Sequence, residues 1–135
     1  MSGSFNFNLN RKHLFMPPLE ELMEDARIFD KKILMETFDN DEDLISEILD
    51  SFIAAVPRYL SELQKSMKEN NCEAVFRMAH TIKGSSANIA AYGIREVALQ
   101  IEMAGKNGEI EKAESHFEKL EEEFARLEAA LKTKS

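Results

Sequence analysis

The sequence predicts an all-α protein: an antiparallel up-down-up-down four-helix bundle with short additional N-terminal helices. Apolar residues recur every three or four positions through most of the chain after residue 40. Asparagine and glycine residues divide this pattern into helix-length segments joined by short links. Strand-like alternation is confined to the first ten residues. Short links between amphipathic helices favour antiparallel neighbours, as in such a bundle.

The composition describes one folded, acidic domain. The chain has 135 residues, of which 44% are hydrophobic and 31% are charged. Its formal charge of −8 opposes binding to nucleic acids and to anionic membranes. Cys72 is the single cysteine, so no internal disulfide forms. Neither a membrane-spanning apolar run nor a signal-peptide pattern is present, so we expect a cytoplasmic protein without membrane contact.

The N-terminal region is expected to lie at the margin of the fold. Residues 1–18 are predicted as an irregular or disordered arm, and residues 19–135 as the bundle domain, with a core at about 41–131. Residues 19–26 are a short helical candidate. Asp30 is the type of residue that caps a second short helix.

A long amphipathic helix is predicted from Asp41 onward. Its apolar stripe consists of Leu44, Ile45, Ile48, Leu49, Phe52, Val56, Leu60, Leu63 and Met67. Pro57 lies inside this stripe and removes the hydrogen bond to the carbonyl of Ile53, which predicts a kink. The Asn70-Asn71 pair then ends the pattern.

Two further helices follow. The first has an apolar face made of Val75, Met78, Ala79, Ile82, Ser86 and Ile89. It is expected to end near Ala91. The second has a stripe made of Ile94, Val97, Ala98, Ile101 and Ala104. Gly105 and the Asn107-Gly108 turn are expected to close it, while Met67, Met78 and Met103 are interpreted as packing residues.

The last helix is predicted as one continuous element. Its stripe consists of Ile110, Ala113, Phe117, Leu120, Phe124, Leu127 and Leu131. This heptad spacing would also suit a coiled coil. His116 has neither a lysine nor a glycine at a matching spacing, so we interpret it as structural, and His13 in the arm carries no functional signal.

The residues that could carry out a reaction lie around His80. His80, Lys83, Gly84 and Ala87 share one helical stripe, away from the apolar face, so His80 is expected to be exposed. Gly84 costs about 1 kcal/mol inside a helix relative to alanine. Because helical side chains lean toward the N-terminus, a residue at this position normally covers the histidine ring, and glycine leaves it open.

The charge beside this open ring indicates phosphoryl transfer. Lys83 would offset the negative charge of a phosphorylated histidine, whereas a cation disfavours metal binding at the same ring. Ser85 is a candidate donor to the phosphate. Ser86 lies on the core stripe and is expected to bond back to its own helix.

The segment AHTIKGSSANI, residues 79–89, resembles the motif of the histidine phosphotransfer (HPt) family, and the resemblance covers roughly residues 41–131. It implies a four-helix bundle whose exposed His80 accepts a phosphoryl group from a receiver-domain aspartate and returns it to another receiver. It further implies that Glu102 on the next helix orients His80 by accepting a hydrogen bond. Family members often have glycine where Ala90 stands, which is a departure.

The resemblance also implies roles for Lys83 and Gly84 and a set of partners. Lys83 would steady the phosphoryl group, and Gly84 would give access to the ring. Response-regulator receiver domains and a hybrid histidine kinase are the expected partners, with Mg²⁺ on the receiver and no cofactor or metal in this chain.

The chain has no nucleotide-binding motif, so we expect a monomeric phosphocarrier in a multistep phosphorelay rather than an enzyme. Two alternatives stay open at this point. One is a helical-bundle adaptor that binds a receiver without carrying phosphate, and the other is the phosphoacceptor part of a chemotaxis-type kinase.

Overall fold

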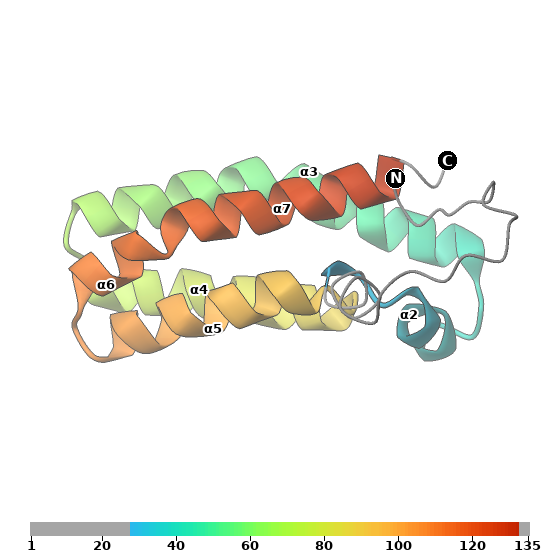
Figure 1. The fold of residues 1–135 in the computed structure, drawn as a ribbon, viewed down its shortest axis with the longest axis horizontal. Coiled ribbons are helices and arrows are strands. Elements are labelled where there is room, and N and C mark those ends of the chain that lie inside the picture. Colours follow the sequence, from blue (N-terminus) through green and yellow to red (C-terminus); the bar gives the residue numbers. More distant parts are fainter. Residues whose placement is uncertain (1–27, 133–135) are drawn as a thin grey trace, which may run out of the picture.

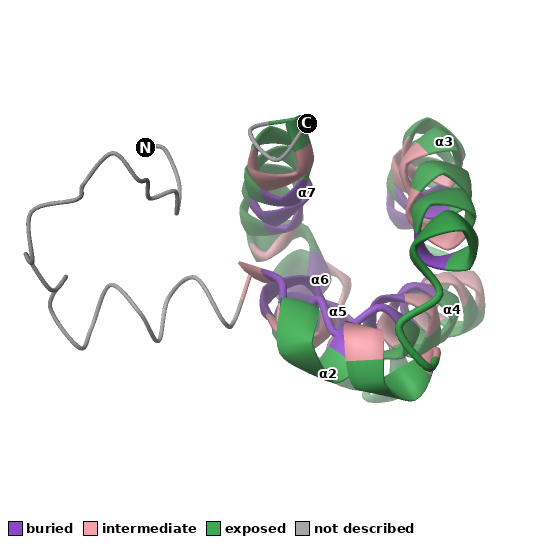
Figure 2. Cartoon of the chain, turned by 90° about the vertical axis from the view of Figure 1, so that its right-hand side faces the viewer, coloured by how far each residue is buried: buried purple, intermediate pink, exposed green. Residues whose placement is uncertain are grey.

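A computed structural model describes residues 28–132 of the chain, and its regular elements in that range are all helices (Figure 1). They are α2 (Lys31–Thr37), α3 (Glu42–Lys68), α4 (Cys72–Asn88), α5 (Tyr92–Lys106), α6 (Ile110–Ser115) and α7 (Phe117–Lys132). Seen from one end, α3, α4, α5 and α7 occupy the four corners of a bundle, and α2 lies across the end of α4 and α5 (Figure 2). The predicted all-α bundle is confirmed. The expectations for residues 1–18 and 19–26 fall outside the described range.

Side-chain caps define where three of the helices begin. Asp30, Asp41 and Asn71 each accept a hydrogen bond from the backbone N–H three residues further on, at 3.2, 3.1 and 3.0 Å. The predicted cap at Asp30 is therefore confirmed. The backbone N–H of Asp30 also donates to the carbonyl of Ala90 at 3.0 Å, which joins the start of α2 to the α4–α5 connection.

The long helix α3 continues through Pro57, as predicted, and the kink at this residue stays a prediction. Its stripe differs from the expectation at two positions. Leu44 is 40% exposed, because it lies in the first turn at the end of the bundle. Tyr59 is buried instead, and its ring meets that of Phe52 edge-on at 6.2 Å.

Helix α4 ends at Asn88, earlier than the predicted end near Ala91. Ala90 adopts a left-handed conformation with φ of 58°, and the N–H of Ala91 donates to the carbonyl of Ser86 at 2.9 Å. This pattern closes the helix in the way that a glycine normally allows. At an alanine the left-handed conformation costs about 1 kcal/mol. The departure noted at Ala90 therefore lies at the turn that terminates the helix.

The prediction that the Asn107-Gly108 turn closes α5 is confirmed, but the part of it that assigned the closure to Gly105 is wrong. Gly105 is buried inside α5, and the left-handed turn that follows the helix is at Gly108, with φ of 73°. A local turn and a close packing contact both favour glycine, so the residue type alone does not separate them.

The prediction of one continuous last helix is also wrong, because the helix is interrupted at His116 between α6 and α7. The Ser115 hydroxyl donates to the carbonyl of Lys112 at 2.6 Å, and that carbonyl is the normal α-helical acceptor for the N–H of His116. The His116 N–H bonds to Ala113 instead, at 3.1 Å. Apolar periodicity continues across the break, since Ala113, Leu120 and Leu127 are all fully buried.

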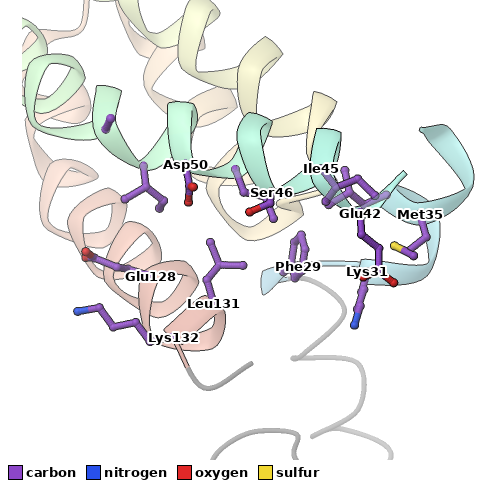
Figure 3. A pocket seen from close by; sticks show the side chains of 14 residues that line it. Phe29, Lys31, Met35, Glu42, Ile45, Ser46, Asp50, Glu128, Leu131 and Lys132 are labelled. Atoms are coloured by element: carbon purple, nitrogen blue, oxygen red, sulfur yellow. The ribbon is translucent and has the colours of Figure 1, made fainter. Parts of the chain in front are cut away.

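A groove of about 640 Å³ lies at the α2 end of the bundle, between α2, α3 and α7. Phe29, Ile45 and Leu131 are among its lining residues (Figure 3). Within residues 28–132, no helix is both long enough and apolar enough to cross a membrane.

Candidate functional site

His80 lies on the outer face of α4, with 63% of its side chain exposed. The opposite face of the same helix carries Val75, Ala79 and Ile82, whose side chains are fully buried in the core. The predicted division of this helix into a core face and an exposed face is confirmed. Because the core residues anchor α4, the imidazole is presented outward from a rigid element.

Glu102 on α5 brings its carboxylate to His80 and Lys83 at once. Its Oε2 lies 2.6 Å from Nδ1 of His80, and its Oε1 lies 2.7 Å from Nζ of Lys83. The Glu102 side chain is only 9% exposed, so the carboxylate is held between α4 and α5 rather than extended into solvent. The three side chains suggested by the sequence and by its resemblance therefore form one connected group.

The charge state of Glu102 determines how the imidazole is protonated. Burial raises the pKa of the Glu102 carboxyl, but hydrogen bonds and positive charge from Lys83 and His80 lower it by more, so the net shift is downward. An ionised carboxylate can only accept hydrogen bonds. In a neutral imidazole the proton must then sit on Nδ1, which leaves Nε2 with a lone pair.

The space over the imidazole is open. A Cβ atom built at Gly84 would meet nothing within 4 Å, and the residue is exposed. The Lys83 side chain is 26% exposed and donates to Glu102. Since an ammonium carries three donors, this ion pair leaves capacity for a second acceptor beside the ring.

Ser85 faces a different partner. Its hydroxyl lies 3.4 Å from the phenolic oxygen of Tyr59, at the contact between α4 and α3. Ser86 donates to the carbonyl of Lys83 at 3.0 Å, which confirms that it bonds back to its own helix. The structure therefore brings together His80, Lys83 and Glu102, with Gly84 beside them, and turns Ser85 toward the bundle.

One neighbour of the site was missed by sequence reasoning, and one methionine was misread. The Phe76 ring stacks on the His80 ring with centroids 6.1 Å apart and planes 20° apart. Its position one turn before His80 on the same stripe was an available signal. Met103, next to Glu102, is 49% exposed, so its interpretation as a packing residue is wrong, whereas Met67 is buried as expected.

The groove at the α2 end is separate from this site, because none of its lining residues belongs to α4 or α5. Among the described residues, no cluster of three or more His, Cys, Asp or Glu side chains is arranged to hold a metal ion. The chemistry that the His80 group offers is that of a nucleophilic nitrogen backed by a carboxylate.

Comparisons with known proteins point to the same chemistry. The family model for the Hpt domain matches residues 47–130. The phosphorelay intermediate protein rdeA of Dictyostelium discoideum is 37% identical over 95 residues, which cover 70% of this chain and 37% of that protein. The chain thus corresponds to well under half of that relative.

Two solved structures share the fold. Histidine-containing phosphotransfer protein B from Pseudomonas aeruginosa superposes with a TM-score of 0.73 at 25% identity, over 78% of this chain and 92% of that one. The HPT domain of a sensor hybrid histidine kinase from Shewanella gives 0.69 at 19% identity, over 81% and 94%. Since the family model matches more than half of the sequence, this chain belongs to the Hpt domain family.

Proposed function

We propose that this protein is a phosphocarrier in a multistep phosphorelay, in which His80 accepts a phosphoryl group from a receiver-domain aspartate and passes it to another receiver. One observation carries the proposal: an exposed imidazole whose Nδ1 is held at 2.6 Å by the Glu102 carboxylate. Membership of the Hpt domain family supports it. The similarity to a phosphorelay intermediate protein of Dictyostelium supports it as well.

The geometry suits attack through Nε2. The Nε2 lone pair forms a bond to the phosphorus of an aspartyl phosphate, the phosphorus–oxygen bond to the aspartate breaks, and the aspartate leaves as a carboxylate with the electron pair. No proton has to move, because Nε2 carries none. The phosphorylated ring gains a positive charge, which the Glu102 carboxylate offsets at Nδ1. Transfer to the next receiver is the same reaction in reverse.

The neighbouring residues receive supporting roles in this proposal. Lys83 adds positive charge beside the incoming phosphoryl group, from a position where it already pairs with Glu102. Gly84 keeps the approach to the ring open. Ser85 would donate to the phosphate only after its hydroxyl turns away from Tyr59, so its proposed role requires a side-chain rearrangement.

The partners follow from the chemistry. Receiver domains of response regulators supply and remove the phosphoryl group, and a hybrid histidine kinase is the proposed upstream source. Mg²⁺ is expected on the receiver, where it offsets the phosphoryl charge. In this proposal the carrier acts as a cytoplasmic monomer and as a transfer intermediate rather than an enzyme, in keeping with a sequence that has no nucleotide-binding motif.

Phosphoryl transfer from a panel of radiolabelled receiver domains tests the proposal. We expect wild-type protein to take up label that is stable in base and labile in acid, as a phosphohistidine is. His80→Gln should take up none while its helical circular dichroism stays unchanged, because the side chain lies outside the core. His116→Gln is the matched control and should label normally. Wild-type protein that accepts label from no receiver would refute the proposal and favour an adaptor.

A further inference from the structure

A close backbone approach between α4 and α5 occurs at Gly105. A Cβ atom built on this residue would lie 2.8 Å from the backbone nitrogen of Phe76, 3.1 Å from its Cα and 3.1 Å from the carbonyl oxygen of Cys72. All three atoms belong to the backbone of α4, so they cannot turn aside as a flexible side chain would. Gly105 is therefore a point where α5 lies directly against α4.

This contact lies one helical turn from the His80–Glu102 hydrogen bond. Glu102 precedes Gly105 by three residues on α5, and His80 follows Phe76 by four residues on α4, so each pair shares a helix face. The two helices run antiparallel and are joined by a short connection. The separation of the helices at Gly105 therefore controls the distance at which Glu102 meets His80.

The close approach at Gly105 also affects Phe76, the second residue that contacts the imidazole. The Phe76 ring stacks on the His80 ring, and the Phe76 backbone is what a side chain at position 105 would displace. Relieving a 2.8 Å contact between a carbon and a backbone nitrogen requires a shift of roughly half an ångström or more. A hydrogen bond of 2.6 Å that lengthens by this amount passes from the short, charge-assisted range to the long end of the ordinary range, which lowers the preference for a proton on Nδ1.

We propose that Gly105 is a positioning residue for His80. By carrying no side chain, it sets the α4–α5 separation at which the Glu102 carboxylate holds the proton on Nδ1 and leaves Nε2 unprotonated. The inference rests on the proposed function for its biological meaning. The effect of Gly105 on the imidazole tautomer, however, is a property of the unphosphorylated protein and can be measured without phosphoryl transfer.

The test is the tautomer of His80 in Gly105→Ala, read from the ¹⁵N shifts of the two ring nitrogens at a pH where the ring is neutral. We expect wild-type protein to show a protonated Nδ1 and an unprotonated Nε2. In Gly105→Ala both shifts should move at least halfway toward the averaged values of Glu102→Ala, in which the acceptor is absent. The His116 ring signals in the same spectra serve as an internal reference.

A matched control separates positioning from general loss of stability. Leu127→Ala truncates a fully buried residue on α7, so it should lower the melting temperature but leave the His80 shifts at their wild-type values. Should Gly105→Ala be only partly folded, trimethylamine N-oxide, which favours compact states, allows the spectra to be recorded on folded protein.

Wild-type ring shifts in folded Gly105→Ala would overturn the inference. That result is distinguishable from a failure of the proposed function, because the tautomer is measured without any phosphoryl donor. If wild-type protein accepts phosphate, the acceptance rate of Gly105→Ala should also fall, in proportion to the loss of the Nδ1-protonated tautomer.

Discussion

Replacing Glu102 with glutamine tests the contribution of its charge to phosphoryl acceptance. The amide keeps an oxygen that can accept the hydrogen bond from Nδ1 of His80, so the ring loses little of its orientation. The variant removes the negative charge opposite the ring, and the ring becomes cationic when Nε2 is phosphorylated. It also removes the acceptor for Lys83, because the amide nitrogen then faces that ammonium. The variant therefore removes an interaction that grows during the reaction, and such interactions govern its rate.

The magnitude follows from the distance and the exposure of the two groups. Two unit charges about 4 Å apart attract by about 4 kcal/mol at the effective dielectric constant found near protein surfaces. The His80 side chain is 63% exposed, so solvent screening reduces this to about 1–2 kcal/mol. Since about 1.4 kcal/mol corresponds to a factor of ten, we expect Glu102→Gln to accept phosphate roughly 5- to 30-fold more slowly.

The assay is the initial rate of label uptake from one efficient receiver domain under single-turnover conditions, with circular dichroism to verify the fold. Glu123→Gln is a suitable control, because Glu123 is also buried but lies on α7, next to Lys119 and Arg126. It should accept phosphate at the wild-type rate. A Glu102→Gln rate within a factor of two of wild type, in folded protein, would refute the electrostatic argument.

The other predictions concern Gly84, Gly108 and the pH dependence of stability. Gly84→Ala should leave transfer nearly unchanged, because its Cβ meets nothing within 4 Å, whereas the longer side chain of Gly84→Leu should cover the ring and block label uptake; equal rates for both variants would contradict the access argument. Gly84→Ala should also raise the free energy of unfolding by about 1 kcal/mol through helix propensity. Gly108→Ala should lower it by about 1 kcal/mol because φ is 73° there, and urea titrations that give the two changes the same sign would contradict the backbone reasoning. The lowered pKa of Glu102 implies that its contribution to stability is fully present above the unfolded carboxyl pKa of about 4.3 and is lost as the pH falls through the folded value. The difference in unfolding free energy between wild type and Glu102→Gln should therefore shrink between about pH 7 and about pH 3, and a constant difference would show that the carboxylate is not preferentially stabilised in the folded state.

Local signals in the sequence were sufficient to predict most helices. Asp30, Asp41 and Asn71 act within one turn of the helices they cap, so their effect does not depend on the rest of the fold. The break at His116 was missed because the hydroxyl of Ser115 takes a backbone acceptor without disturbing the apolar stripe. Periodicity reports which face is buried, not whether each backbone hydrogen bond is made.

In the candidate site, too, contacts within one helix could be predicted from the residue pattern of the sequence, and contacts between helices could not. By itself the sequence determined that His80, Lys83 and Gly84 share an exposed stripe, because they lie within about one turn of a single helix. The hydrogen bond between Glu102 and His80 was implied by the family resemblance alone, whereas the contact of Glu102 with Lys83 and the close approach of Gly105 to Phe76 were decided only by the tertiary structure. These contacts join residues on two helices, so they depend on the separation and register of α4 and α5. Packing between the helices sets both quantities, and the periodicity of either helix alone does not specify them.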